Sequence, residues 1–200
     1  MDLKGKKVLV FGAGKSGIGA ADLLGSVGAQ PIIYDGNENL DKEAVLHKTN
    51  GTYTPEIWAG AFPEGEMESL DLVVLSPGVP TDLPLVKSFY EKGLPVWSEV
   101  ELAYRTGKGE VLAITGTNGK TTTTALLGKI MGDARESVFV VGNIGTAYTS
   151  KSLEMREDSV TVAEISSFQL ETIEQFRPKV SAILNITEDH LNRHHTMEEY

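Results

Sequence analysis

An apolar run followed by a glycine-rich turn constrains this chain more than any other feature. Val111 to Ile114 predicts a buried strand, and the loop 115–119 that follows contains two glycines. Lys120 and Thr121 come next, and the apolar spacing of 125–131 predicts a helix. A helix that begins directly after such a loop points its free N–H groups and the positive end of its dipole at an anion. The segment therefore predicts a phosphate site.

The chemistry of such a loop assigns roles to two side chains. Lys120 reaches the β- and γ-phosphates, and the Thr121 hydroxyl holds a magnesium ion. The usual spacing places a glycine where Ile114 stands, and the first glycine here is Gly116, so the loop is a shortened variant. The alternative is a glycine turn with an exposed lysine, and the strand before and helix after favour the phosphate site.

A second glycine loop lies near the start of the chain. Val8 to Phe11 predicts a strand, Gly12 to Gly17 reads G-x-G-x-x-G, and 18–27 predicts a helix. Pro31 to Tyr34 predicts the next strand, and Asp35 follows it. This is the pattern of a dinucleotide site, in which the glycines admit a pyrophosphate and the acid binds a ribose hydroxyl. Any nucleotide diphosphate satisfies the same geometry, and the glycines could instead serve only tight strand–helix packing.

The remaining apolar runs predict a parallel α/β architecture. They alternate with helical segments and are apolar throughout, which predicts strands buried on both faces in doubly wound sheets. The polar break Thr106–Gly109 predicts a domain boundary, with a Rossmann-like domain over 1–106 and a P-loop-type α/β domain over 107–200. The further predicted strands are Leu70–Leu75, Pro95–Trp97, Ser137–Val141, Ser159–Ala163 and Val180–Leu184.

Polar residues follow the ends of several predicted strands, and such ends share one rim of a parallel sheet. The turn Ser76–Pro80 faces the first glycine loop or is a plain Pro-Gly turn. Asn143 binds a substrate or only tolerates a left-handed turn conformation. Glu164 suits a magnesium ligand or a water-holding carboxylate, and His190 suits a ligand. A zinc pair of His190 and His194 has no cysteine or further pair to support it.

Composition excludes several classes of protein. The net charge is −10 with no basic stripe, which argues against a nucleic-acid partner. There is no cysteine, so disulfides and thiolate–metal sites are excluded. The first apolar run is too short for a signal peptide, and no run reaches membrane-spanning length. We expect a cytoplasmic monomer with no membrane insertion.

These motifs together resemble the Mur ligase family of ATP-dependent amino-acid ligases, over the whole chain. The phosphate loop alone marks the wider family, whereas its combination with the first glycine loop and the Glu-x-Ser-Ser-Phe-Gln-Leu run is more specific. The pattern is most similar to the branch that adds D-glutamate. The segments that carry the resemblance are Gly12–Gly17, Ser76–Pro80, Thr115–Thr122, Gly142–Gly145, Glu164–Leu170 and Asn185–His190.

The resemblance implies that the first domain binds UDP rather than NAD. Asp35 then reads the uridine, and the first glycine loop and the Ser76 turn hold the diphosphate. Asn143, Ser166 and Gln169 of the second domain then lie beside the muramoyl-alanine end of the substrate or the metals. The substrate-binding residues implied are Gly14, Lys15, Ser16, Gly17, Asp35, Ser76, Pro77, Gly78, Asn143, Ser166 and Gln169.

The resemblance also implies an ATP and Mg²⁺ site in the second domain. Thr121 and Glu164 hold one magnesium ion and His190 a second, and Lys120, Glu164 and His190 form the catalytic group. The ATP-binding residues implied are Gly116, Thr117, Asn118, Gly119, Lys120, Thr121 and Thr122.

The reaction implied belongs to peptidoglycan precursor synthesis. The γ-phosphate of ATP passes to the carboxylate of UDP-N-acetylmuramoyl-L-alanine, and the amine of D-glutamate attacks the acyl phosphate. Asn192 stands where the family often has Asp. The family's metal-bridging lysine and third domain would lie beyond Tyr200, so we expect no turnover by this chain alone.

Four alternatives remain open from sequence. A nicotinamide-dependent oxidoreductase explains the first glycine loop but leaves Lys120 and Glu164 unexplained. A P-loop kinase or GTPase-like switch leaves the first domain without a role, and the chain has no guanine-reading Asn-Lys-x-Asp motif. The third alternative is another ligase of the family, such as the L-alanine-adding enzyme. The fourth is a module that binds its ligands without catalysing a reaction.

Overall fold

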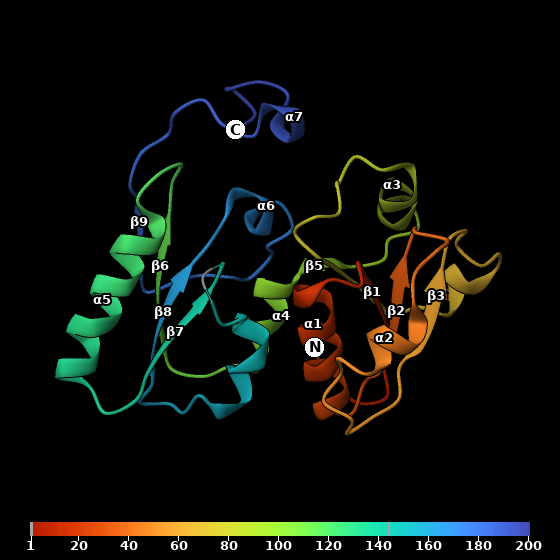
Figure 1. Cartoon of the computed structure of the whole chain (residues 1–200), viewed down its shortest axis with the longest axis horizontal. Helices are drawn as coiled ribbons and strands as arrows, with labels where there is room; N and C mark the ends of the chain where they lie inside the picture. Colours follow the sequence, from red (N-terminus) through yellow and green to blue (C-terminus); the bar gives the residue numbers. More distant parts are fainter. Residues whose placement is uncertain (1, 144) are drawn as a thin grey trace.

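The computed structural model describes residues 2–143 and 145–200 and contains two parallel β-sheets side by side (Figure 1). The first sheet has the strand order β3-β2-β1-β4-β5, in which the order reverses between β1 and β4. Ligands of such sheets bind at this reversal, outside the carboxyl ends of the strands. The elements are β1 (Lys7–Phe11), α1 (Lys15–Ser26), β2 (Gln30–Asp35), α2 (Lys42–Leu46), β3 (Glu56–Ala59), the 3-10 helix η1 (Glu66–Ser69), β4 (Leu72–Leu75), α3 (Pro84–Glu91), β5 (Val96–Ser98) and α4 (Glu99–Thr106).

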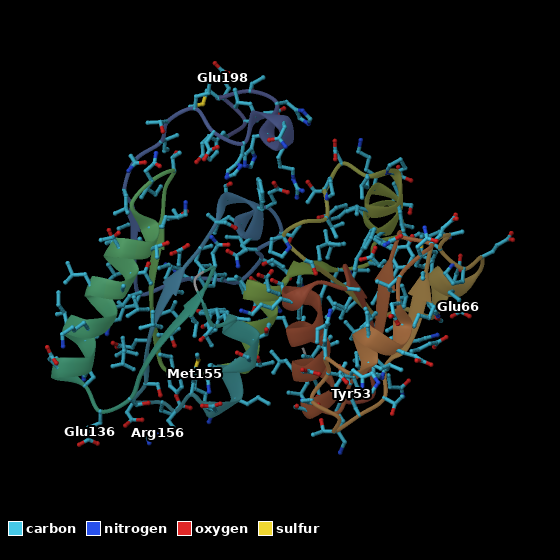
Figure 2. The ribbon with its side chains drawn as sticks, viewed as in Figure 1. Tyr53, Glu66, Glu136, Met155, Arg156 and Glu198 are labelled. Atoms are coloured by element: carbon cyan, nitrogen blue, oxygen red, sulfur yellow. The ribbon has the colours of Figure 1, made fainter. Side chains whose placement is uncertain are left out.

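The second sheet has the strand order β7-β8-β6-β9, again parallel throughout. Its strands point toward the end of the molecule where Glu198 lies, opposite the end with Glu136 and Arg156 (Figure 2). The elements are β6 (Glu110–Thr115), α5 (Lys120–Ala134), β7 (Val138–Gly142), η2 (Tyr148–Ser150), η3 (Ser152–Glu154), β8 (Val160–Glu164), α6 (Ser167–Leu170), β9 (Val180–Ile183) and α7 (Leu191–His194).

Helix α4 connects the two sheets and belongs to both hydrophobic cores. Leu102 packs in the cluster formed by α1 and the first sheet, together with Leu24 and Val74. Val100 and Ala103, on the same helix, pack in the cluster of the second sheet. Helix α4 lies between the two sheets (Figure 1). Because its apolar residues pack in both cores, separating the sheets would expose both faces of the helix to water.

A buried carboxylate on α4 fixes the second sheet's side of this junction. Glu101 is fully buried and accepts backbone N–H hydrogen bonds from Glu174, Gln175 and Phe176 at 2.8–2.9 Å. Arg105, one turn later, donates to the same carboxylate and stacks over the Trp97 ring at 3.9 Å. The segment 174–176 is thereby tied to the helix that joins the two sheets.

The structure confirms the predicted parallel strands and corrects four details. Helix α1 begins at Lys15, inside the glycine motif, rather than at 18. Strand β3 was not predicted. Strand β9 is not buried on both faces, since Val180 and Ile183 are more than half exposed. Helix α5 packs through Thr124 and Gly128 and leaves apolar side chains exposed on its outer face, among them Leu126 and Ile130.

No helix in the described part of the chain is both long enough and apolar enough to cross a membrane.

Candidate functional site

The first glycine loop is built so that its backbone comes close to its surroundings. Gly12 has φ +106°, and a Cβ there would lie 2.8 Å from the Ser76 side chain. A Cβ on Gly17 would lie 1.8 Å from the Gly12 carbonyl oxygen. Gly17 therefore serves strand–helix packing, the alternative considered from sequence, while Gly14 stands at the N-cap of α1 and lines a cavity.

Asp35 holds this loop in place. Its Oδ2 accepts the backbone N–H of Ala13 at 3.0 Å, and its Oδ1 accepts that of Asn37 at 3.0 Å. The carboxylate still lines the cavity and has acceptor positions left, because two oxygens offer about four. Asp35 thus has a supporting role for the loop that the sequence pattern did not predict.

The first pocket is a cavity of about 600 Å³ at the reversal of the strand order. It brings the first glycine loop, Asp35 and the Ser76 turn together, as the shared-rim argument predicts. Asn143, from the end of β7, reaches the same cavity from the second sheet. Its lining is Phe11, Gly12, Gly14, Lys15, Ser16, Asp35, Gly36, Ser76, Pro77, Gly78, Val79, Pro80, Leu83 and Asn143.

The second glycine loop runs from β6 into α5. Gly116 has φ +134°, and a Cβ there would press on the backbone of Asn185 at 3.0 Å. The Lys120 ammonium donates to the carbonyl oxygens of Gly116 and Thr117 at 2.6 and 3.0 Å, so it lies across the mouth of the loop. Asn118 and Asn185 exchange two hydrogen bonds of 2.9 Å, which joins the loop to the end of β9.

The second pocket is a cavity of about 240 Å³ beside this loop. It shares Pro77 and Asn143 with the first pocket, so the two cavities meet at these residues. Lys120 and His190, expected from their strand-end positions, line it, and so does Ser166, which the family resemblance implied. Its lining is Pro77, Gly116, Thr117, Lys120, Asn143, Ser166, Ser167, Phe168, Asp189, His190 and Tyr200.

Glu164 lies behind the meeting point of the pockets and is 2% exposed. Its Oε1 accepts the Asn143 side-chain amide at 3.0 Å, whereas its Oε2 is buried with no hydrogen-bond partner in the described structure. A buried carboxylate oxygen left unpaired is costly, and a cation is the group that compensates it best. Glu164 therefore fits the magnesium ligand expected from its strand-end position.

The expected metal ligands do not form a cluster of acidic and histidine side chains in the described part of the chain. Across residues 2–143 and 145–200, no three His, Asp or Glu side chains gather to form a metal site by themselves. Magnesium sites of nucleotide-binding proteins commonly use one or two protein oxygens and complete the shell with phosphate oxygens and water. Thr121, at the start of α5, and Glu164 fit that kind of site.

His190 is positioned by its backbone conformation and by packing on an aromatic ring. It has φ +53° and its ring packs 5.0 Å from the ring of Phe168. His194 packs on the same phenylalanine at 5.4 Å and hydrogen-bonds Ser167 Oγ at 2.8 Å through Nε2. The His194 ring is thus engaged by Ser167, which weighs further against a zinc pair.

Ser166 is positioned by Gln169 and, behind it, by a buried acid. Gln169 Oε1 accepts from the Ser166 backbone N–H at 2.8 Å and from its hydroxyl at 3.0 Å. Gln169 Nε2 donates to Glu99 Oε1 at 2.7 Å. Glu99 is 3% exposed, and burial raises its pKa to about 7. Gln169 therefore supports the second pocket from outside its lining, a role the sequence did not predict.

Several predicted residues lie next to the pockets without lining them: Gly17, Asn118, Gly119, Thr121, Thr122, Glu164 and Gln169. Sequence reasoning also missed lining residues. Phe168 lies inside the Glu-x-Ser-Ser-Phe-Gln-Leu run and could have been found there. Tyr200 carries no such signal, and its hydroxyl lies 2.8 Å from Thr117 Oγ1.

The fold and the two loops define a parallel α/β protein in which a Rossmann-like sheet stands beside a phosphate-loop sheet. Two family models match it. The model for the Mur ligase MurD-like N-terminal domain matches residues 6–98, and the model for the Mur ligase middle domain matches residues 114–200. The chain belongs to the Mur ligase family.

Curated relatives agree with this assignment. The UDP-N-acetylmuramoylalanine–D-glutamate ligase of Lachnospira eligens is 62% identical over 200 residues, and that of Lachnoclostridium phytofermentans is 60% identical. Each comparison covers 100% of this chain and 44% of the relative. The chain thus spans less than half the length of these relatives.

Solved structures show the same fold. The UDP-N-acetylmuramate:L-alanyl-gamma-D-glutamyl-meso-diaminopimelate ligase from Neisseria meningitides matches with a TM-score of 0.55 at 17% identity, covering 94% of this chain and 63% of that one. A UDP-N-acetylmuramate-alanine ligase from Thermotoga maritima matches with a TM-score of 0.51 at 24% identity, covering 97% and 45%.

Proposed function

We propose that this chain is the substrate- and ATP-binding part of a ligase that adds D-glutamate to UDP-N-acetylmuramoyl-L-alanine. The observation that carries the proposal is that the two pockets meet at Pro77 and Asn143. A nucleotide-linked acid in the first pocket can then present its carboxylate to a nucleoside triphosphate in the second pocket. The names of the relatives supply the particular substrate.

The first pocket suits a nucleoside diphosphate. The N-terminus of α1 opens onto it at Gly14 and Lys15, where free N–H groups favour an anion. The Ser76 hydroxyl lies beside this loop, 3.3 Å from the Gly12 carbonyl oxygen. We assign the diphosphate to these groups, and the uracil and ribose to the side of the pocket where Asp35 lies.

The second pocket suits the phosphates of ATP. Lys120 now donates to loop carbonyl oxygens that are weaker acceptors than a phosphate oxygen, so an incoming γ-phosphate can compete for it. Thr121 and Glu164 would hold Mg²⁺, which neutralises phosphate charge, and His190 would lie at a second ion.

The reaction needs two anions to approach each other. Lys120 stabilises the charge on the transferred phosphoryl group, and Asn143 lies where the carboxylate of the first substrate enters the second pocket. The carboxylate oxygen attacks phosphorus, ADP leaves, and the D-glutamate amine then displaces phosphate from the acyl phosphate to form the amide. Ser166, held by Gln169, lies on the same wall.

We propose residues 1–106 and 107–200 as the two domains, and a cytoplasmic setting for a reaction whose substrates are soluble nucleotides. The monomer expected from sequence stays a prediction. The absence of turnover by this chain alone also stays a prediction. It is supported by the length of the relatives, which are more than twice as long as this chain.

The test is a phosphate-release assay on a protein that carries this chain within the relatives' full length. The proposal predicts release that requires ATP, UDP-N-acetylmuramoyl-L-alanine and D-glutamate together, and none with L-glutamate. Release with UDP-N-acetylmuramate and L-alanine instead would assign the protein to another ligase of the family. Release by this chain alone would contradict the expectation that further residues are needed.

A further inference from the structure

One arginine contacts both halves of the molecule. The Arg193 guanidinium pairs with both oxygens of Glu171, at 3.1 Å from Nε and 2.7 Å from a terminal nitrogen. The same terminal nitrogen donates to the backbone carbonyl oxygen of Val79 at 2.8 Å. The Thr81 hydroxyl donates to Glu171 at 3.1 Å. The ion pair is thus bound to the 76–81 turn at two points, one from each partner.

This ion pair is largely shielded from water. The Arg193 side chain is 11% exposed and the Glu171 side chain is 18% exposed. Exposed pairs contribute little because water and salt screen them, whereas a shielded pair with a planar two-bond geometry fixes its partners in one arrangement. Arg193 therefore holds the 76–81 turn of the first sheet in a defined position.

Arg193 also contacts the second pocket. Its guanidinium carbon lies 5.0 Å from the centre of the Phe168 ring, which lines that pocket. The His190 ring packs on Phe168 at 5.0 Å, and the backbone N–H of Arg193 donates to the His190 carbonyl oxygen at 2.9 Å. A shift of Arg193 must therefore disturb the wall formed by His190 and Phe168.

At the first pocket, Arg193 hydrogen-bonds to the turn that is expected to hold the diphosphate. Val79 lines the first pocket together with Ser76, Pro77 and Gly78, and its N–H donates to the Ser76 carbonyl oxygen at 2.9 Å. The contact with Arg193 thus fixes the residue that closes this turn. One side chain supports a wall of each pocket.

We propose that Arg193, through its ion pair with Glu171, is a positioning residue that couples the two pockets, so that a ligand in one strengthens binding in the other. The proposal rests on the assignment of the pockets to a UDP-linked acid and to ATP. A ligand that orders one wall also orders Arg193, and the other ligand then meets a wall that no longer has to be ordered.

The variant Arg193→Met/Glu171→Gln tests the coupling. It removes both charges together, so no charge is left buried alone, and the glutamine can still accept from Thr81. The matched control is Lys151→Met/Glu154→Gln, which removes an exposed ion pair of 2.8 Å. The probe is UDP-N-acetylmuramoyl-L-alanine, titrated with and without a non-hydrolysable ATP analogue and Mg²⁺.

The wild type and the control should bind the probe about fivefold or more tightly when the analogue is present, within the usual range of coupling. In the double variant this ratio should fall close to one, while each ligand alone still binds. Arg193→Lys should restore little of the ratio, because one ammonium cannot replace the planar fork that reaches Glu171 and Val79 together. An unchanged ratio in the double variant, or no coupling in the wild type, overturns the proposal.

Hydrogen exchange separates this proposal from the assignment of the ligands. Without any ligand, the double variant should exchange faster at Val79 and at 193–195 than the control does. Equal exchange rates overturn the positioning role even if both ligands bind. Failure of the wild type to bind either probe contradicts the proposed function instead, and the exchange rates still decide whether Arg193 holds both walls.

Discussion

Asn143 donates twice to Glu164, from its side-chain amide to Oε1 at 3.0 Å and from its backbone N–H to the main-chain carbonyl oxygen at 2.8 Å. The end of β7 is thereby fixed to the end of β8. Asn143 lines both pockets, and Glu164 lies behind it with Oε2 unpaired in the described structure. The residue that lines both pockets is thus held by the acid that we propose as the magnesium ligand.

Glu164→Gln should remove the effect of magnesium on nucleotide binding. The amide keeps an acceptor for Asn143 but has no charge to bind a cation, and an uncharged NH2 group takes the place of the unpaired buried oxygen. We expect MgATP at 100 times its Kd to stabilise the wild type by about 2.7 kcal/mol and the variant by little more than ATP without metal does. Thermal unfolding with and without MgATP measures this. Glu157→Gln, at an exposed acid, is the control, and a full magnesium effect in Glu164→Gln would exclude the assigned role.

Lys120→Ala should weaken ATP binding by about 100-fold or more, since a charge-assisted hydrogen bond to phosphate in a shielded site contributes about 3 kcal/mol. Lys129→Ala is the matched control, because Lys129 lies on the same helix with 77% of its side chain exposed and should leave the Kd unchanged. Titration with ATP and Mg²⁺ gives both values. Equal affinities for the two variants would show that the 115–120 loop does not hold the phosphates.

Glu99→Gln should change how stability depends on pH. Burial raises the pKa of Glu99 to about 7, above its unfolded value, so its favourable contribution is complete below the unfolded pKa and declines as the pH rises toward 7. The neutral glutamine escapes this decline and can still accept from Gln169. We expect equal stability near pH 4 and a variant more stable by about 3 kcal/mol at pH 8. Urea unfolding at both pH values measures the difference, and parallel pH profiles would contradict it.

Glu101→Ala should be strongly destabilising. The carboxylate is buried, which raises its pKa, but the N–H groups of 174–176 and Arg105 outweigh burial and hold the pKa below its usual value. Its removal leaves these donors unpaired, at a cost of about 3–5 kcal/mol at neutral pH. The cost should shrink as the pH falls and the wild-type carboxylate takes up a proton. The control Glu110→Ala removes an exposed partner of Lys179 and should leave the urea midpoint unchanged.

Most of the strands could be predicted because they are short apolar runs buried in parallel sheets. Such runs can be recognised from the sequence alone. Strand β3 escaped prediction because Glu56–Ala59 at the sheet edge is short and only partly buried. Helix α1 begins inside the glycine motif because Gly14 acts as its N-cap, which a glycine pattern does not reveal.

The pockets were predictable where residues follow strand ends, since parallel strands bring those ends to one rim. Asn143, Ser76 and His190 are of this kind. The supports of the pockets were not predictable, because Glu99 and Arg193 act through partners about 70 and 22 residues away in the chain. Such contacts depend on tertiary packing, and no local spacing encodes that.

The assignment of the first pocket is tested most directly by a calorimetric titration of this chain with UDP-N-acetylmuramoyl-L-alanine and, separately, with NAD. Asp35→Asn is the test variant, since it removes the charge beside the first pocket and keeps one acceptor, and Asp133→Asn, at an exposed site on α5, is the control. We predict binding of the UDP conjugate, weakened about tenfold or more in Asp35→Asn only, as the loss of one charged hydrogen bond implies, and no binding of NAD. Binding of NAD without the UDP conjugate would contradict the account and make the first glycine loop a dinucleotide site.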